Sequence, residues 1–464
     1  YRPKVDVGSV VSGFQNRVSQ PGRTLFSGIS RLKAGRGLKV NISKVQATVE
    51  HVLHRKLNLE KWVDFFNSEP SEEDVLQVYA DQIGIACKMR LPSEVDFYTT
   101  LSGGLDSALI NVFSKKTSSQ EIKSIFGKST ESSPQVGNDL SELAASQYTS
   151  EQLNTNHQDF SMIDDGCVPL YNYQAANAYD GLLCEGVVCY QQLAQYVRQK
   201  GAKVLIVSDG PDELVGGYGM DASAFNLYQR FSTHGQIVEG FFKSFAGLEC
   251  LAKLITNDRY KHLANWACFN NKPFRFRPIH SGTPAKTMSN LFEAGYESSA
   301  VKEFGTIPRA YDDLLGYLDI SQKMALSYAA YSIPDYFNLR SDRGTMLESV
   351  ELRLPFLDPN LVQLMIATPA KWRFHASNWS KYILRKLVDM EIGPQIAYRG
   401  KYGFAYPAWH IPRLAKALAI EETISNFPSF EDLGFKRGAK EFLLRPEESR
   451  QRWFALCVGQ TVNQ

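Results

Sequence analysis

Residues 95–110 read Val95-Asp-Phe-Tyr-Thr-Thr-Leu-Ser-Gly-Gly-Leu-Asp-Ser-Ala-Leu-Ile110, and this stretch sets the fold that we expect for the rest of the chain. Its first seven residues are rich in β-branched and aromatic types, which favour a buried strand, and the apolar run from Ala108 is typical of a helix. The polar turn between them lies where a parallel strand ends and a helix begins. Free backbone N–H groups and the helix dipole favour an anion at such a position.

The side chains of this turn indicate that the anion is a magnesium nucleotide. Gly103 and Gly104 let the backbone approach phosphate oxygens without a Cβ in the way. The hydroxyls of Ser102 and Ser107 can donate to those oxygens, whereas Asp106 would repel phosphate unless a cation lay between them. A short Gly-rich turn can also be purely structural. The longer pattern, Ser-Gly-Gly-Leu-Asp-Ser after a hydrophobic strand, resembles the PP-loop of ATP pyrophosphatases, which implies cleavage of ATP between its α and β phosphates.

Strands alternate with helices along the first half of the chain, which is typical of a parallel, doubly wound α/β sheet. The last third is predicted to be mostly helical. We therefore expect an α/β fold of the PP-loop (HUP-like) type with a helical C-terminal extension. Besides the strand before the turn, the pattern predicts strands at 122–127, 157–162 and 202–208, helices at 139–153 and 185–200, and a helix pair at 59–90.

A second polar turn follows the strand at 202–208 and reads Asp209-Gly-Pro-Asp-Glu213. Asp and Gly after a strand are ordinary turn residues, so a solvated loop with a helix cap is one interpretation. The alternative is functional, because ligands bind beyond the carboxyl ends of the strands in such sheets. Asp212 would then face the same crevice as Asp106, and two aspartates from neighbouring strand ends could hold Mg²⁺ against a triphosphate.

Composition excludes several classes of protein. The 464 residues are 44% hydrophobic and 22% charged with a net charge of +2, so we expect a globular protein and neither a nucleic-acid-binding nor a membrane protein. The 7 cysteines show no C-x-x-C pair, which indicates reduced thiols, no zinc site and a cytoplasmic location.

Four separated blocks together resemble the synthetase domain of the asparagine synthetase superfamily, whose members include β-lactam synthetase, carbapenam synthetase and lasso-peptide cyclases. The blocks are 102–107, 209–218, 342–358 and 381–404, and the segment Thr24-Leu-Phe-Ser-Gly-Ile-Ser-Arg-Leu-Lys-Ala-Gly35 looks like the end of the family's glutaminase domain. We therefore expect residues 1–58 to be a remnant of that domain with a linker, and residues 59–464 to be the PP-loop synthetase domain.

The resemblance implies a role for each matching residue. ATP and pyrophosphate are expected at Ser102, Gly103, Gly104, Asp106, Ser107, Asp209, Gly210 and Lys381, and Mg²⁺ at Asp106 and Asp212. The expected reaction is attack of a carboxylate on the α-phosphorus, followed by displacement of AMP by a nitrogen nucleophile. Lys401 would stabilise the oxyanion of that second step, and Glu351, alone or with Tyr317, would orient or deprotonate the amine.

Two departures from the family pattern leave the substrates open. Asp209 stands where asparagine synthetases usually have Glu, and the glutaminase nucleophile, an N-terminal cysteine, has no counterpart here. We expect an AMP-forming amide synthetase acting on a small-molecule or peptide carboxylate and an amine or ammonia. Glutamine- or ammonia-dependent asparagine synthesis, with a glutaminase subunit as partner, and a non-catalytic interaction protein are the alternatives. The sequence leaves a homodimer open.

Overall fold

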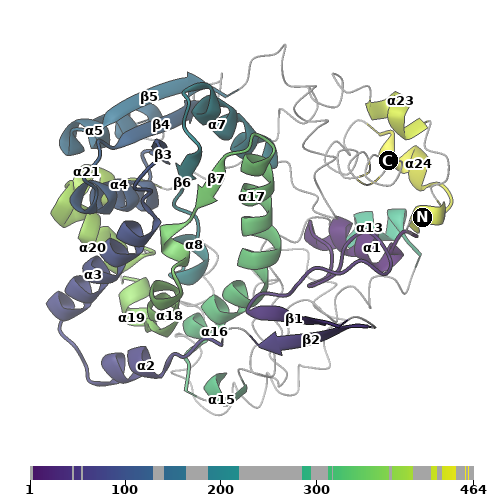
Figure 1. Ribbon diagram of the computed structural model, residues 1–464, viewed down its shortest axis with the longest axis horizontal. Helices are drawn as coiled ribbons and strands as arrows, with labels where there is room; N and C mark the ends of the chain where they lie inside the picture. Colours follow the sequence, from purple (N-terminus) through teal and green to yellow (C-terminus); the bar gives the residue numbers. More distant parts are fainter. Residues whose placement is uncertain are drawn as a thin grey trace.

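The structure is a computed structural model that describes residues 4–43, 46–53, 56–128, 141–162, 186–218, 285–293, 312–315, 317–375, 379–400, 420–425 and 431–445, together with Ala455 and Val458. Within these ranges, no helix has the length and apolar character needed to cross a membrane. The centre of the fold is a five-stranded sheet in the order β5-β4-β3-β6-β7, and every neighbouring pair in it is parallel (Figure 1). Its strands are β3 (Phe97–Thr100), β4 (Lys123–Lys128), β5 (Asn156–Ser161), β6 (Val204–Ile206) and β7 (Glu351–Arg353).

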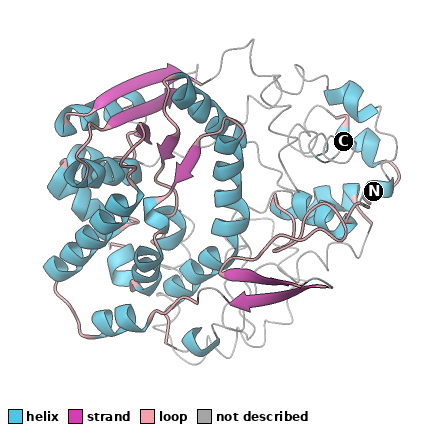
Figure 2. Cartoon of the chain, viewed as in Figure 1, coloured by secondary structure: helices cyan, strands magenta, loops and turns pink. Residues whose placement is uncertain are grey.

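Helices surround this sheet, as Figure 2 shows. The first half of the chain contributes α2 (Glu60–Asn67), α3 (Glu72–Arg90), α4 (Leu105–Thr117), α5 (Glu142–Leu153), α7 (Val187–Gln199) and α8 (Pro211–Leu214). The second half contributes α15 (Asp312–Leu315), α16 (Ile320–Ser327), the π-helix η3 (Tyr328–Phe337), α17 (Asn338–Met346), the 3₁₀-helix η4 (Pro355–Leu357), α18 (Pro359–Ala367), α19 (Ala370–Arg373), α20 (Tyr382–Glu391) and α21 (Pro394–Ala397).

Successive residues of the central strands enter different clusters, as the alternation of a pleated strand requires. Phe97, Val204 and Ile206 belong to the largest hydrophobic cluster, together with residues of α3, α4, α18 and α20. Tyr98 and Leu205 belong to a second cluster with residues of α7. Both faces of the sheet are therefore covered, which confirms the doubly wound α/β fold.

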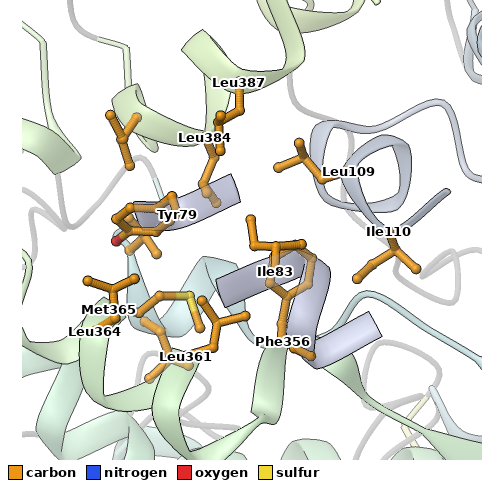
Figure 3. Packing of buried hydrophobic residues seen from close by; sticks show 14 of the residues in the cluster. Tyr79, Ile83, Leu109, Ile110, Phe356, Leu361, Leu364, Met365, Leu384 and Leu387 are labelled. Carbon is orange, nitrogen blue, oxygen red and sulfur yellow. The ribbon is translucent and has the colours of Figure 1, made fainter. Parts of the chain in front are cut away.

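The largest cluster packs the helices of the second half against those of the first. Side chains of α3 such as Tyr79 and Ile83 lie between Leu361 and Met365 of α18 and Leu384 of α20 (Figure 3). The Tyr79 hydroxyl lies 2.6 Å from the Thr368 hydroxyl, so this buried polar group has a partner. The C-terminal helices thus complete the core of the α/β domain.

A second, smaller core lies apart from the sheet (Figure 1). It contains Val10 and Phe14 of the N-terminal helix with Phe292, Phe435 and Phe442 from the second half of the chain. The predicted boundary at residue 58 stays a prediction, and this cluster mixes residues from both sides of it. The elements that contribute to this core are α1 (Val7–Asn16), α13 (Ala285–Leu291), α23 (Ile420–Ser425), η5 (Glu431–Leu433) and α24 (Ala439–Leu443). An exposed antiparallel ribbon follows α1 in the chain and consists of β1 (Arg36–Ile42) and β2 (Ala47–Leu53).

The strands and helices expected in the first half are confirmed within one to three residues at their described ends, but β7 is a correction. No strand was expected in 342–358, a block of the chain's mostly helical last third, whereas α17 ends at Met346 and a strand begins at Glu351. Ser349 has φ 55°, a left-handed conformation that turns the chain out of the helix. The three-residue strand then pairs with β6, and this tertiary pairing leaves little trace in the local sequence.

Candidate active site

The glycine turn between β3 and α4 is held by its own side chains. The backbone N–H of Ser102 donates to the Ser107 hydroxyl at 3.1 Å, and the two hydroxyl oxygens are also 3.1 Å apart. Gly103 has φ 73°, and a Cβ there would lie 2.5 Å from the carbonyl oxygen of Glu142 on α5. The turn therefore requires glycine for its conformation and for close packing on α5.

Hydrogen bonds of two buried side chains, Thr99 and Asn111, hold the same turn against the strand. The Asn111 amide on α4 donates to the carbonyl oxygens of Thr100 and Ser107, at 3.0 and 2.8 Å. The Thr99 hydroxyl donates to the Asn111 side-chain oxygen at 2.6 Å. The end of β3 and the first turn of α4 are thus bound to each other, which places Asp106 at the N-terminus of a rigid helix.

The second polar turn follows β6, the strand next to β3. Gly210 has φ 122°, and a Cβ there would lie 2.7 Å from the Leu357 side chain, so the turn again needs glycine. Asp212 lies in the first turn of α8, and a Cβ on Gly217 would collide with the Asp212 carboxylate and with the Lys381 side chain. The two turns end neighbouring parallel strands, so both lie at the same edge of the sheet.

Lys381 joins the two turns. Its side chain is 5% exposed, and its Nζ lies 2.5 Å from Asp106 Oδ2 and 2.5 Å from Asp212 Oδ1. Burial disfavours the charged amine, but the two carboxylates outweigh burial, so the pKa of Lys381 is raised above its usual value. The structure thus brings together Asp106, Asp212 and Lys381, which come from three distant blocks of the chain.

The side chains here that could bind a metal ion suit a metal that is also held by a nucleotide better than one held by protein side chains alone. Asp106 and Asp212 converge on one point, and the described residues contain no group of three or more His, Cys, Asp or Glu side chains that could hold a metal. Mg²⁺ is commonly bound by one or two carboxylates together with phosphate oxygens and water. Burial, with the charge of Asp212 next, raises the pKa of neighbouring Glu213 to about 8, and this carboxyl accepts from the Tyr218 hydroxyl.

Two arginines connect this site to the segment that precedes Lys401. Arg385 on α20 donates to the carbonyl oxygens of Ser380 and Ala397, at 2.7 and 2.5 Å. Arg399 donates to the carbonyl oxygen of Gly103 at 3.3 Å. The chain therefore reaches the glycine turn at Arg399, while Lys401 itself lies outside the described residues.

Asp209 lies among groups that the sequence did not indicate. The Tyr190 hydroxyl on α7 donates to Asp209 Oδ2 at 2.6 Å, and the Arg340 guanidinium on α17 lies 3.6 Å from the same oxygen. Arg340 also donates to the Tyr190 hydroxyl at 3.2 Å. Burial and the charge of Asp209 raise the pKa of Tyr190 well above its usual value, so this phenol stays a hydrogen-bond donor.

The strand register places Glu351 away from this site, and Tyr317 is exposed. Glu351 is the first residue of β7 and pairs with Val204 at the start of β6, so it lies at the edge of the sheet opposite the two turns. Its side chain is 61% exposed and contacts Arg353 at 2.9 Å. Tyr317 is 82% exposed. The register of a parallel strand places Glu351 away from the nucleotide edge, and we carry neither residue into the reaction below.

Comparison with known proteins finds a family model and curated relatives that match the chain. The model of the family described as asparagine synthase matches residues 79–456. Asparagine synthetase [glutamine-hydrolyzing] 1 of Bacillus subtilis is 24% identical over 366 residues, which cover 74% of this chain and 52% of that protein. A putative asparagine synthetase [glutamine-hydrolyzing] of Mycobacterium tuberculosis is 22% identical over 416 residues, covering 85% of this chain and 57% of that protein. The chain thus spans about half the length of the curated relatives it matches.

Proposed function

The chain belongs to the asparagine synthase family, and from that premise we propose that it is an ATP-dependent, amide-forming synthetase that releases AMP and pyrophosphate. The carrying observation is the convergence of Asp106, Asp212 and Lys381 beside the Ser102–Ser107 turn. Each of these residue types has an expected function in binding the nucleotide. Hydroxyls and free N–H groups bind phosphate oxygens, carboxylates hold a cation, and a lysine follows the charge of the leaving group.

In the first step, an oxygen of the substrate carboxylate attacks the α-phosphorus of ATP, and the bond to the β-phosphate oxygen breaks. Pyrophosphate leaves with that bonding pair. The donors of the glycine turn and the Lys381 ammonium bind its charge, which grows as the bond breaks. Asp106 and Asp212 would hold Mg²⁺, which would supply positive charge to neutralise the triphosphate. With its carboxylate partners engaged in this way, the Lys381 ammonium would be available to the phosphates.

In the second step, a nitrogen nucleophile attacks the acyl carbon, loses a proton and displaces AMP. Lys401 remains our proposal for stabilising the oxyanion of this step. Asp209, three residues before Asp212, lies on the same turn, and Arg340 and Tyr190 hold its carboxylate. We assign this Asp209–Tyr190–Arg340 cluster to positioning of the carboxylate or amine substrate, in place of the Glu351 and Tyr317 pair.

Asparagine formation is the second candidate, because the curated relatives carry that name. The Asp209-Gly-Pro-Asp turn differs from the usual family pattern, and this favours a substrate other than free aspartate. A non-catalytic protein would have no need to keep Asp106, Asp212 and Lys381 converging in one buried cluster.

The test is pyrophosphate release from MgATP with a panel of carboxylates, with and without ammonia. We expect release with a carboxylate that carries its own amine and no ammonia. Release only with aspartate plus ammonia would establish the second candidate, and no release with any carboxylate would support the non-catalytic alternative. The Asp106→Asn variant should abolish any release that the unaltered chain shows, whereas Asp96→Asn, in an exposed ion pair with Lys123, should retain it.

A further inference from the structure

The starting point is η3, a π-helix of 10 residues that contains Pro334 and leads directly into α17, the helix of Arg340. π-helices are rare and usually last a single turn, and they often mark functional sites. Proline inside a helix removes a backbone donor. A π-helix of this length therefore needs support from tertiary contacts.

Residues 17–31 of the N-terminal segment supply such contacts. Arg31 lies 3.5 Å from Asp335 of η3, and the two side chains are 14% and 16% exposed, so the ion pair is largely removed from water. Arg17 donates to the Tyr336 hydroxyl at 3.4 Å. Val18 is 2% exposed and lies in one hydrophobic cluster with Tyr336 and Phe337.

The same π-helix also contacts Arg340, which pairs with Asp209 of the candidate active site. The Arg340 guanidinium lies over the rings of Phe337 and Tyr190, at 5.1 Å from each centroid, and over Tyr336 at 5.9 Å. It lies 3.6 Å from Asp209. Arg31, Asp335 and Tyr336 are thus joined to Asp209 through contiguous contacts.

We propose that residues 17–31 are a positioning element for the substrate end of this site, with Arg31 as its main residue, because they hold η3 in the register that keeps Arg340 paired with Asp209. If η3 relaxed to an α-helix, the residues that follow would rotate about the helix axis. The rotation would be about 100° for each residue by which their register along the helix shifts. Arg340 would then leave Asp209, while Asp106, Asp212 and Lys381, which lie on other elements, would stay in place.

The expected change in turnover rests on the proposed function, whereas the expected change in hydrogen–deuterium exchange does not. In Arg31→Ala, hydrogen–deuterium exchange should rise at Asn338–Met346 and stay unchanged at Tyr382–Glu391. Turnover with the accepted carboxylate should fall roughly tenfold to a hundredfold through kcat, with the KM for ATP unchanged, since small misplacements of a positioned group have that cost. Arg31→Lys should recover most of the turnover, as should the exchanged pair Arg31→Asp with Asp335→Arg.

The matched control is Arg23→Ala, which removes another Arg–Asp pair of the same segment, with Asp6, also at 3.5 Å. It should leave both the exchange of Asn338–Met346 and kcat unchanged. Unaltered exchange in Arg31→Ala, or an equal effect of Arg23→Ala, would overturn the inference. If no carboxylate supports turnover in the unaltered chain, the proposed function fails while the exchange measurement still decides the coupling.

Discussion

The Lys381 ammonium lies 2.5 Å from the Asp106 carboxylate, although 275 residues separate them in the chain. Lys381 itself has φ 57°, a left-handed conformation just before α20, so the backbone there is held by its surroundings. With Asp212 at the same distance, one buried cation is shared by two carboxylates. This arrangement is what a magnesium nucleotide must displace, and it leads to the first prediction.

Lys381→Met should lower the free energy of unfolding by about 3–5 kcal/mol without Mg²⁺, because two carboxylates would face each other without a cation. Millimolar MgCl₂ should recover part of that loss and should raise the Tm of the variant more than that of the unaltered chain. The measurement is a thermal melt with and without the metal. Lys386→Met on the same helix, which removes a half-exposed pair with Glu72, is the control and should show no such magnesium effect.

Gly217→Ala should reduce both stability and pyrophosphate release, because the added Cβ would collide with Asp212 and with Lys381. The backbone of Asp212 is among the atoms that must move, so rotation of one side chain cannot relieve the overlap. Gly84→Ala in α3 is the matched control. Its Cβ would meet only a Phe113 ring carbon at 3.7 Å, so the change should be neutral or stabilising by about 1 kcal/mol. Equal behaviour of the two variants would speak against a close approach at Gly217.

Arg373→Met should cost about 3 kcal/mol of stability, because hydrogen bonds to a charged group each contribute more than neutral ones. Arg373 is 1% exposed and donates to the carbonyl oxygens of Thr368, Met365 and Ile366 at the end of α18, and to that of Leu214 at the end of α8. Urea unfolding measures the loss. Arg373→Lys should recover little, since an ammonium cannot reach all four oxygens. Lys371→Met, on the exposed side of the same short helix, should change stability by less than about 0.5 kcal/mol.

His157 should make stability depend on pH. Burial lowers the pKa of His157, with partial opposition from Asp159, so the folded state binds fewer protons than the unfolded state just below about pH 6.5. The free energy of unfolding therefore falls as pH decreases through this window and is constant above it, as far as this group is concerned. His157→Asn should flatten the slope between pH 7 and 5. An unchanged slope in His157→Asn would contradict the assignment.

The fold was predictable where a strand has a strong apolar run of its own. The strands that became β3, β4 and β6 had that signal, whereas β5 (Asn156–Ser161) is mostly polar and was expected from the alternation of strands with helices. β7 had no such signal, because its three residues become a strand only by pairing with β6. The helix α1 and its cluster with side chains of α13, α23 and α24 also had no local signal, since the contacts cross most of the chain.

Some residues of the candidate site could also be predicted from the sequence, and others could not. Asp106 and Asp212 were expected to converge because carboxyl ends of neighbouring parallel strands share one edge, and the contacts with Lys381 agree with that expectation. Arg340 and Tyr190 were missed, because an arginine on a helix and a buried tyrosine are ordinary residues until their contact with Asp209 is seen. Glu351 was assigned by resemblance alone, and the register of β7 places it at the other edge.

The most direct test is to determine which bond of ATP is broken. The products can be identified by ³¹P nuclear magnetic resonance during turnover with a carboxylate that the protein accepts. We predict that the unaltered chain and Lys386→Met each form AMP and pyrophosphate in equal amounts. The rate of pyrophosphate release should fall at least about a hundredfold in Lys381→Met. Formation of ADP and phosphate, or undiminished pyrophosphate release from Lys381→Met, would contradict the claim that this buried cluster holds the leaving group.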